Sequence, residues 1–153
     1  MKRVYAREEV CAGCKLCEVY CATAHSEYPN SILKAFLKQE TRPIARILVE
    51  VDQPLSFALQ CRHCEEANCT QACITGAMTK NPETGIVTND ESRCVGCWTC
   101  VLVCPYGAIK RDETGHKVAS KCDLCSNNDT NPICVEKCPN NALIFAEISR
   151  GGE

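Results

Sequence analysis

The chain has only short stretches in which apolar and polar positions form a regular pattern. Segments 46–51 and 142–148 are rich in β-branched and apolar residues, and they predict two strands. Segments 85–88 and 116–119 show the same bias over fewer residues and predict two shorter strands. Apolar residues at helical spacing between 31 and 38 predict a helix with a packing face. No apolar run approaches the roughly 18 residues of a transmembrane helix, so we expect no membrane span.

The composition shows that these short elements cannot build an ordinary core. Leu, Ile, Val and Phe make up 32 of the 153 residues, whereas cysteine alone contributes 16. The length suits one domain or two very small ones. A chain so poor in large apolar residues needs another way to fill its interior, and disulfides and metal centres are the two candidates.

Charge and the N-terminal segment narrow these possibilities. The net charge is −2 and no basic block occurs, which argues against a nucleic-acid partner. The first nine residues contain no apolar signal region and no twin-arginine motif. We therefore expect a cytoplasmic protein, in which thiols stay reduced and structural disulfides are rare. The cysteine count then indicates metal binding.

The cysteines form an internal repeat of four runs with none left over. The runs are Cys11, Cys14, Cys17 and Cys21; Cys61, Cys64, Cys69 and Cys73; Cys94, Cys97, Cys100 and Cys104; and Cys122, Cys125, Cys134 and Cys138. The first and third runs have the C-x2-C-x2-C-x3-C spacing of ferredoxin-type [4Fe–4S] loops. The other two have the same motif with a longer middle spacer. Zinc is a poorer fit, because a triple run of cysteines over seven residues does not suit a tetrahedral site.

The spacing has a physical reason. Three thiolates from one tight loop can reach three corners of an iron–sulfur cube, and the backbone N–H groups of the loop stabilise its negative charge. The x3 spacing places the third and fourth cysteines one helical turn apart. In two-cluster ferredoxins the fourth cysteine binds the other cluster, so each short helical turn is expected to lie between two cubes.

Other residues add little further chemistry. His63 lies within the second run, where it either donates to a cluster sulfur or points at backbone or solvent. We expect His25 and His116 at the surface, and Trp98 as a cover for the third run's cluster. No phosphate-binding loop, dinucleotide motif or paired nucleophile and base occurs. Four redox centres without a catalytic module indicate an electron carrier.

Nearly the whole chain, from about Met1 to Ile148, resembles the four-cluster electron-transfer subunits of multisubunit redox enzymes. The resemblance rests on the motifs at 11–18, 61–64, 94–100 and 121–125. Members accompany molybdopterin oxidoreductases, formate-linked hydrogenases and carbon monoxide dehydrogenases. This short form is most similar to the iron–sulfur subunit of carbon monoxide dehydrogenase, followed by the small subunit of tungsten- or molybdenum-pterin aldehyde oxidoreductases.

The resemblance also implies which cysteines share a cluster. The four implied ligand sets are Cys11, Cys14, Cys17 and Cys138; Cys21, Cys122, Cys125 and Cys134; Cys61, Cys64, Cys69 and Cys104; and Cys73, Cys94, Cys97 and Cys100. Spacing alone leaves a different pairing open, in which the third and fourth runs exchange ligands. The nested pairing implies an α+β fold of two ferredoxin-like modules, with residues 1–54 and 108–153 as the outer module and 55–107 as the inner one.

The function that follows is non-catalytic. We expect single electrons to pass through four [4Fe–4S] clusters between a catalytic redox subunit and another redox protein. The resemblance favours a catalytic partner of the carbon monoxide dehydrogenase type, with an aldehyde oxidoreductase or hydrogenase as the alternative. The second partner would be a flavin- or NAD(P)H-linked reductase or a soluble ferredoxin. A freely diffusing ferredoxin remains the alternative from another class, and it would not co-purify with an enzyme through salt.

Overall fold

A computed structural model describes residues 1–112, 119–126 and 131–147. In chain order, the elements are β1 (Arg3–Ala6), the 3-10 helix η1 (Glu8–Val10), α1 (Leu16–Ala24), α2 (Ile32–Leu37), β2 (Ile47–Asp52), β3 (Leu55–Gln60), α3 (Asn68–Gln71), β4 (Met78–Lys80), β5 (Val87–Asn89), α4 (Thr99–Leu102), β6 (Ile109–Arg111), β7 (Ala119–Lys121), α5 (Ile133–Glu136) and β8 (Leu143–Ala146). These short strands and helices agree with the predicted α+β class. No helix in the described ranges is long and apolar enough to cross a membrane.

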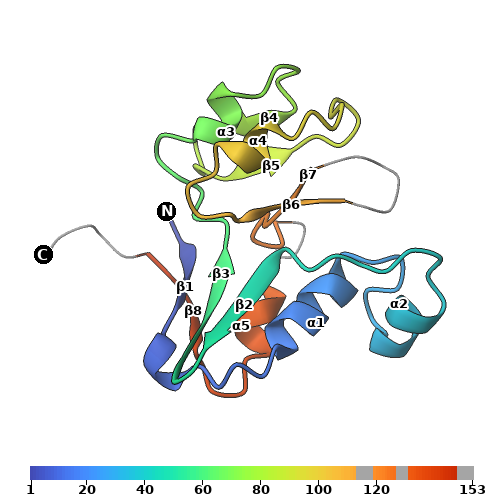
Figure 1. The fold of residues 1–153 in the computed structure, drawn as a ribbon, viewed down its shortest axis with the longest axis vertical. Helices are drawn as coiled ribbons and strands as arrows, with labels where there is room; N and C mark the ends of the chain where they lie inside the picture. Colours follow the sequence, from blue (N-terminus) through green and yellow to red (C-terminus); the bar gives the residue numbers. More distant parts are fainter. Residues whose placement is uncertain (113–118, 127–130, 148–153) are drawn as a thin grey trace, which may run out of the picture.

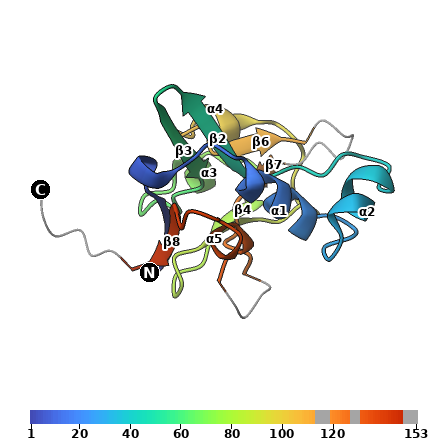
Figure 2. The same ribbon diagram turned by 90° about the horizontal axis from the view of Figure 1, so that it is seen from below.

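The strands pair into four two-stranded antiparallel sheets within the described residues. Three are formed by neighbours in sequence, namely β2 with β3, β4 with β5, and β6 with β7. The fourth joins β1 to β8, with Val4 opposite Phe145, and so brings the two ends of the chain together. In Figure 1, α3, α4, β4 and β5 gather in the upper part, whereas α1, α5, β1 and β8 lie below. Figure 2 shows the same molecule from below, with α1 beside α5.

Two groups of buried residues form the core, and cysteines belong to both. The larger group contains Val4, Cys17, Cys21, Ile47, Val49, Ala58, Cys122, Leu124, Cys134 and Leu143. The smaller group contains Met78, Cys100, Ile109 and Ala119. The β6–β7 hairpin thus packs on the segment that carries the second and third runs. Because cysteine and alanine supply much of the buried surface, the core depends on the groups that the cysteines bind.

Most of the predicted elements are present. Strand 46–51 is confirmed as β2, 85–88 as β5, and 142–148 as β8, although Ile148 lies outside the described residues. Strand β7 begins at the last residue of the predicted 116–119 segment, whose residues 116–118, like His116, also lie outside them. Strands β1, β3, β4 and β6 were not predicted, because none has a long β-branched or alternating pattern.

The helix predicted between 31 and 38 is confirmed as α2, but its packing face is only partly correct. Ser31 begins the helix by accepting a hydrogen bond from the Lys34 N–H at 3.4 Å, which satisfies a free donor of the first turn. Ala35 is buried. Leu33 and Leu37 are 72% and 78% exposed. The apolar stripe therefore packs on the rest of the protein mainly through one small residue.

Candidate metal centres

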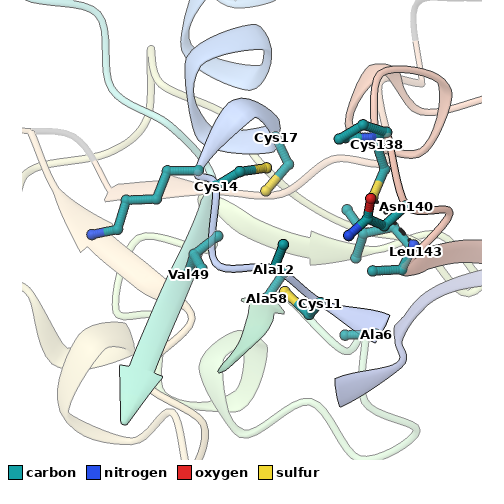
Figure 3. Close-up of a pocket in the computed structure, with 13 residues that line it drawn as sticks. Ala6, Cys11, Ala12, Cys14, Cys17, Val49, Ala58, Cys138, Asn140 and Leu143 are labelled. Carbon is teal, nitrogen blue, oxygen red and sulfur yellow. Dashed lines mark hydrogen bonds between the residues drawn. The ribbon is translucent and has the colours of Figure 1, made fainter. Parts of the chain in front are cut away.

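Four cysteines from opposite ends of the chain line one hollow. Figure 3 shows the sulfur atoms of Cys11, Cys14, Cys17 and Cys138 facing a shared space. The first three come from the loop before α1 and from α1 itself, and Cys138 follows α5. We call this hollow site A. It joins three cysteines of the first run to the last cysteine of the fourth run.

The loop at site A is shaped by Gly13. Its φ of +63° lies in the left-handed region, which glycine adopts without steric cost. A Cβ at this position would lie 3.1 Å from Cγ2 of Val51 in β2. The Ser56 hydroxyl donates to the carbonyl of Cys11 at 2.6 Å. The β2–β3 hairpin therefore packs directly on the loop and holds the cysteines in place.

The second and third runs line two further hollows. Site C is lined by Cys61, Cys64, Cys69 and Cys104, among other residues. Site D is lined by Cys73, Cys94, Cys97 and Cys100, among other residues. With the open space at their mouths included, sites A, C and D measure about 400, 420 and 320 Å³. These similar volumes suit occupants of the same kind.

The remaining four cysteines gather where α1 packs against α5. They are Cys21, Cys122, Cys125 and Cys134, and we call this group site B. Burial raises the pKa of the Cys134 thiol, and the neighbouring thiols of Cys122 and Cys21 raise it further. Site B is the most enclosed of the four, since only Cys125 among its cysteines is not fully buried.

Backbone N–H groups point at several of these sulfurs. Amide donors lie 3.2–3.4 Å from the Sγ atoms of Cys21, Cys61, Cys73, Cys122 and Cys138; they belong to Arg46, His63, Met78, Leu124 and Ala142. Such donors stabilise negative charge on cluster sulfurs and tune the potential. Each of the four sites contains at least one cysteine that accepts such a bond.

The chemistry of the thiols also fits a metal cluster. Burial raises the pKa of Cys17 and of Cys122 to about 12, so without a cation both thiols would keep their protons at neutral pH. Iron replaces the proton and stabilises the thiolate, which couples cluster binding to proton release. Four thiols around one hollow, with amide donors directed at the sulfurs, are the ligands that a [4Fe–4S] cluster requires.

A charged network borders site B, and the sequence interpretation missed it. Nη1 of Arg46 lies 2.7 Å from Oδ2 of Asp123, and Nε2 of His25 lies 3.2 Å from Oδ1 of the same carboxylate. Burial opposes protonation of His25, but its hydrogen bonds to Asp123 and Cys21 raise its pKa to about 9. The surface position expected for His25 is therefore wrong. The charged residues beside Cys122 in the 121–125 motif were the available signal.

His63 and Trp98 take up positions next to the cysteines. His63 is fully buried, and its Nδ1 accepts the Val87 N–H at 3.0 Å, so it binds backbone and not solvent. Burial, reinforced by the positive charges of Lys121 and Arg3, lowers its pKa to about 3. Trp98 lines site D, and the Arg111 guanidinium lies 4.9 Å from its ring centroid.

Comparison with known proteins assigns the family. Residues 53–148 match the family model described as a 4Fe-4S dicluster domain. The electron transport protein HydN of Escherichia coli (strain K12) is 37% identical over 96% of this chain and 89% of its own length. The B subunit of the anaerobic dimethyl sulfoxide reductase of Shigella flexneri is 38% identical over 90% of this chain and 69% of its own length.

The fold has a relative among solved structures. A polypeptide of the active site complex BamBC of benzoyl coenzyme A reductase, in complex with benzoyl-CoA, superposes with a TM-score of 0.51 at 23% identity. The match covers 95% of this chain and 79% of that one. The sixteen cysteines and the family match together give four [4Fe–4S] clusters as the cofactors. The chain therefore belongs to the 4Fe-4S dicluster domain family and is an iron–sulfur electron-transport protein.

Proposed function

We propose that the chain is the non-catalytic electron-transfer subunit of a larger oxidoreductase, and that sites A, B, C and D each hold one of its four clusters. The observation that carries this proposal is the grouping of the cysteines. The four ligand sets implied by the resemblance are the same four sets that gather at sites A, B, C and D. This grouping supports two modules, an outer one built from both chain ends and an inner one on which the β6–β7 hairpin also packs.

The electrostatic neighbours of the thiols support a linear order of the sites. Cys17 of site A raises the pKa of Cys134 of site B. Cys61 of site C acts in the same way on Cys122 of site B. Cys69 of site C acts on Cys100 of site D. The order A–B–C–D follows, because no other pair of sites is needed to connect the row.

Exposure distinguishes the two ends of this row. Cys14 at site A and Cys97 at site D are the exposed cysteines, and Cys21, Cys122 and Cys134 at site B are buried. When bound, the clusters supply one-electron oxidation and reduction. The chain itself holds them in a row and keeps water from the middle. We propose that one redox partner docks at each exposed end.

The catalytic partner is proposed by class. The name of one relative makes it one polypeptide of a reductase, which supports a catalytic subunit as the partner at one end. The carbon monoxide dehydrogenase type remains a prediction from the resemblance, alongside the aldehyde oxidoreductase and hydrogenase types. A reductase or a soluble ferredoxin would serve the other end.

Cluster content is the first expected result. Anaerobically purified protein should be brown and contain about 16 iron and 16 acid-labile sulfide per chain, because four cubes contain four of each. Iron and sulfide assays, with zinc measured in the same sample, check the number. A Cys14→Ser variant should contain at most one cluster less. A preparation dominated by zinc would contradict the four-cluster assignment.

Co-purification tests the subunit role. Affinity-tagged chain, expressed in its own organism and purified anaerobically, should retain one larger redox polypeptide through a wash in about 1 M salt. At that concentration the Debye length is about 3 Å, so purely electrostatic encounters dissociate. Mass spectrometry identifies the retained polypeptide, and an untagged strain is the control. A chain that elutes alone, loaded with iron, would be a diffusing ferredoxin and would contradict the proposal.

A further inference from the structure

Lys121 is a buried lysine that lies between sites B and C. Its residue is 3% exposed, at the end of β7. The Nζ atom donates to the carbonyl of Cys122 at 2.9 Å and also to the carbonyl of Val87. Cys122 belongs to site B, and Val87 lines the hollow of site C. One ammonium group is thus bonded to the backbone of both central sites.

The protein groups around this ammonium do not supply a paired counter-charge. Among the ion pairs of the described ranges none includes Lys121, and the nearby carboxylate of Asp123 is paired with Arg46 and His25. The N–H of Val87 binds His63, which is neutral when it accepts that bond. An isolated ammonium in a dry interior is costly, so negative charge has to come from another source. A cube with its four thiolates carries net negative charge.

The reach of the lysine charge agrees with this position. Burial raises the pKa of Cys69 at site C and of Cys122 at site B, and the charge of Lys121 opposes the rise at both thiols. Lys121 therefore stabilises negative charge on both sides of the junction between the second and fourth runs.

We propose that Lys121 is a positioning residue for electron transfer, whose fixed positive charge raises the reduction potentials of the clusters at sites B and C. The inference rests on the ligand sets proposed above. One electron arrives from a reduced one-electron partner and leaves to an oxidised one; no bond forms or breaks, and the lysine keeps its proton. The charge favours the electron at the middle of the row, where no partner can reach it.

Charge-neutral variants of the holoprotein test this role. In Lys121→Met, two of the four midpoint potentials should fall, and reduction of each should become about tenfold less favourable. Coulomb's law gives this factor for a unit charge about 12 Å away at an effective dielectric constant of about 20. A tenfold change corresponds to about 59 mV for one electron. Potentiometric titration followed by electron paramagnetic resonance measures all four potentials.

Two further variants separate charge from packing. Lys121→Arg keeps the charge and should restore both potentials. Lys121→Gln keeps a hydrogen-bond donor without the charge, and it serves if the methionine variant loses iron. Lys110→Met is the matched control, because Lys110 on the adjacent strand β6 donates to the Ile47 carbonyl at 3.2 Å but lines neither site. Its loss should leave the four potentials unchanged.

The outcomes are distinct. A selective fall in two potentials, reversed by arginine, supports the proposal. Unchanged potentials, an equal shift of all four, or loss of iron from both neutral variants would show that Lys121 acts only through its backbone contacts, and would overturn it. The unmutated protein tests the underlying assignment separately, since fewer than four reducible clusters would count against the ligand sets and not against the lysine.

Discussion

Removal of iron should unfold the chain almost completely. The largest side chains with less than 2% exposure are Ile47, His63, Val87 and Pro132, so little apolar volume is buried without the cysteines. Each sheet of the described ranges has only two strands, and isolated two-stranded sheets are at best marginally stable in water. The structure therefore lacks the core that would keep the metal-free chain folded.

The energetic comparison favours this result. Metal binding in small metal domains supplies on the order of 10 kcal/mol, about as much as the whole stability of a typical domain. Without clusters, the cysteines at sites A and B would be neutral thiols around empty space, and a buried void loses its packing contacts. We expect the far-ultraviolet circular dichroism of the chelated protein to resemble that of an unfolded chain.

The measurement is thermal unfolding followed by circular dichroism, before and after anaerobic chelation. Reconstitution with iron and sulfide should restore the spectrum, which controls for irreversible damage. A cooperative thermal transition of the metal-free protein, at a temperature near that of the loaded protein, would contradict the prediction.

The sequence allowed much of the local structure to be predicted, for a physical reason. The strand at 46–51 and the helix at 31–38 depend on neighbours in sequence, and both are present as β2 and α2. The cysteine runs are equally local, because a tight loop can bring three thiols to one cube only at this spacing. The grouping at sites A–D agrees with what the family resemblance implies, whereas spacing alone left the pairing of runs open.

Long-range features could not be predicted in this way. The pairing of β1 with β8 joins residues about 140 positions apart, and the four residues of β1 have no pattern that specifies a partner. His25 was expected at the surface because nothing near it in sequence indicates Asp123, which lies 98 residues away. The burial of Lys121 likewise depends on where β5 meets β7.

Replacement of Cys21 by serine should perturb the cluster bound mainly by the fourth run, about a hundred residues away in sequence. Cys21 follows Cys17 by one turn of α1, yet the two thiols serve different sites in the proposed arrangement. Cys17 lines site A, while Cys21 lies with Cys122 and Cys134, whose pKa values it raises. The helical turn thus stands between two clusters.

The reciprocal variant and a matched control sharpen this prediction. Cys138→Ser should perturb the cluster of the first run, because Cys138 lines site A together with Cys11 and Cys14. Cys17→Ser, in the same helix as Cys21 and one turn away, should perturb site A and leave site B intact. Serine is a weaker ligand than thiolate, so each variant should shift or abolish one of four paramagnetic signals.

Electron paramagnetic resonance of the reduced single variants, with iron content measured on the same samples, decides between the two arrangements. If each run enclosed its own cube, Cys21→Ser and Cys17→Ser would alter the same signal. If the proposed arrangement holds, Cys21→Ser and Cys134→Ser alter one signal, and Cys17→Ser and Cys138→Ser alter another. This crossing follows from the one-turn spacing, because a helical turn directs its two thiols to neighbouring cubes more readily than around a single one. A shared signal for Cys17 and Cys21 would therefore refute the ligand sets, the linear order and the two-module fold together.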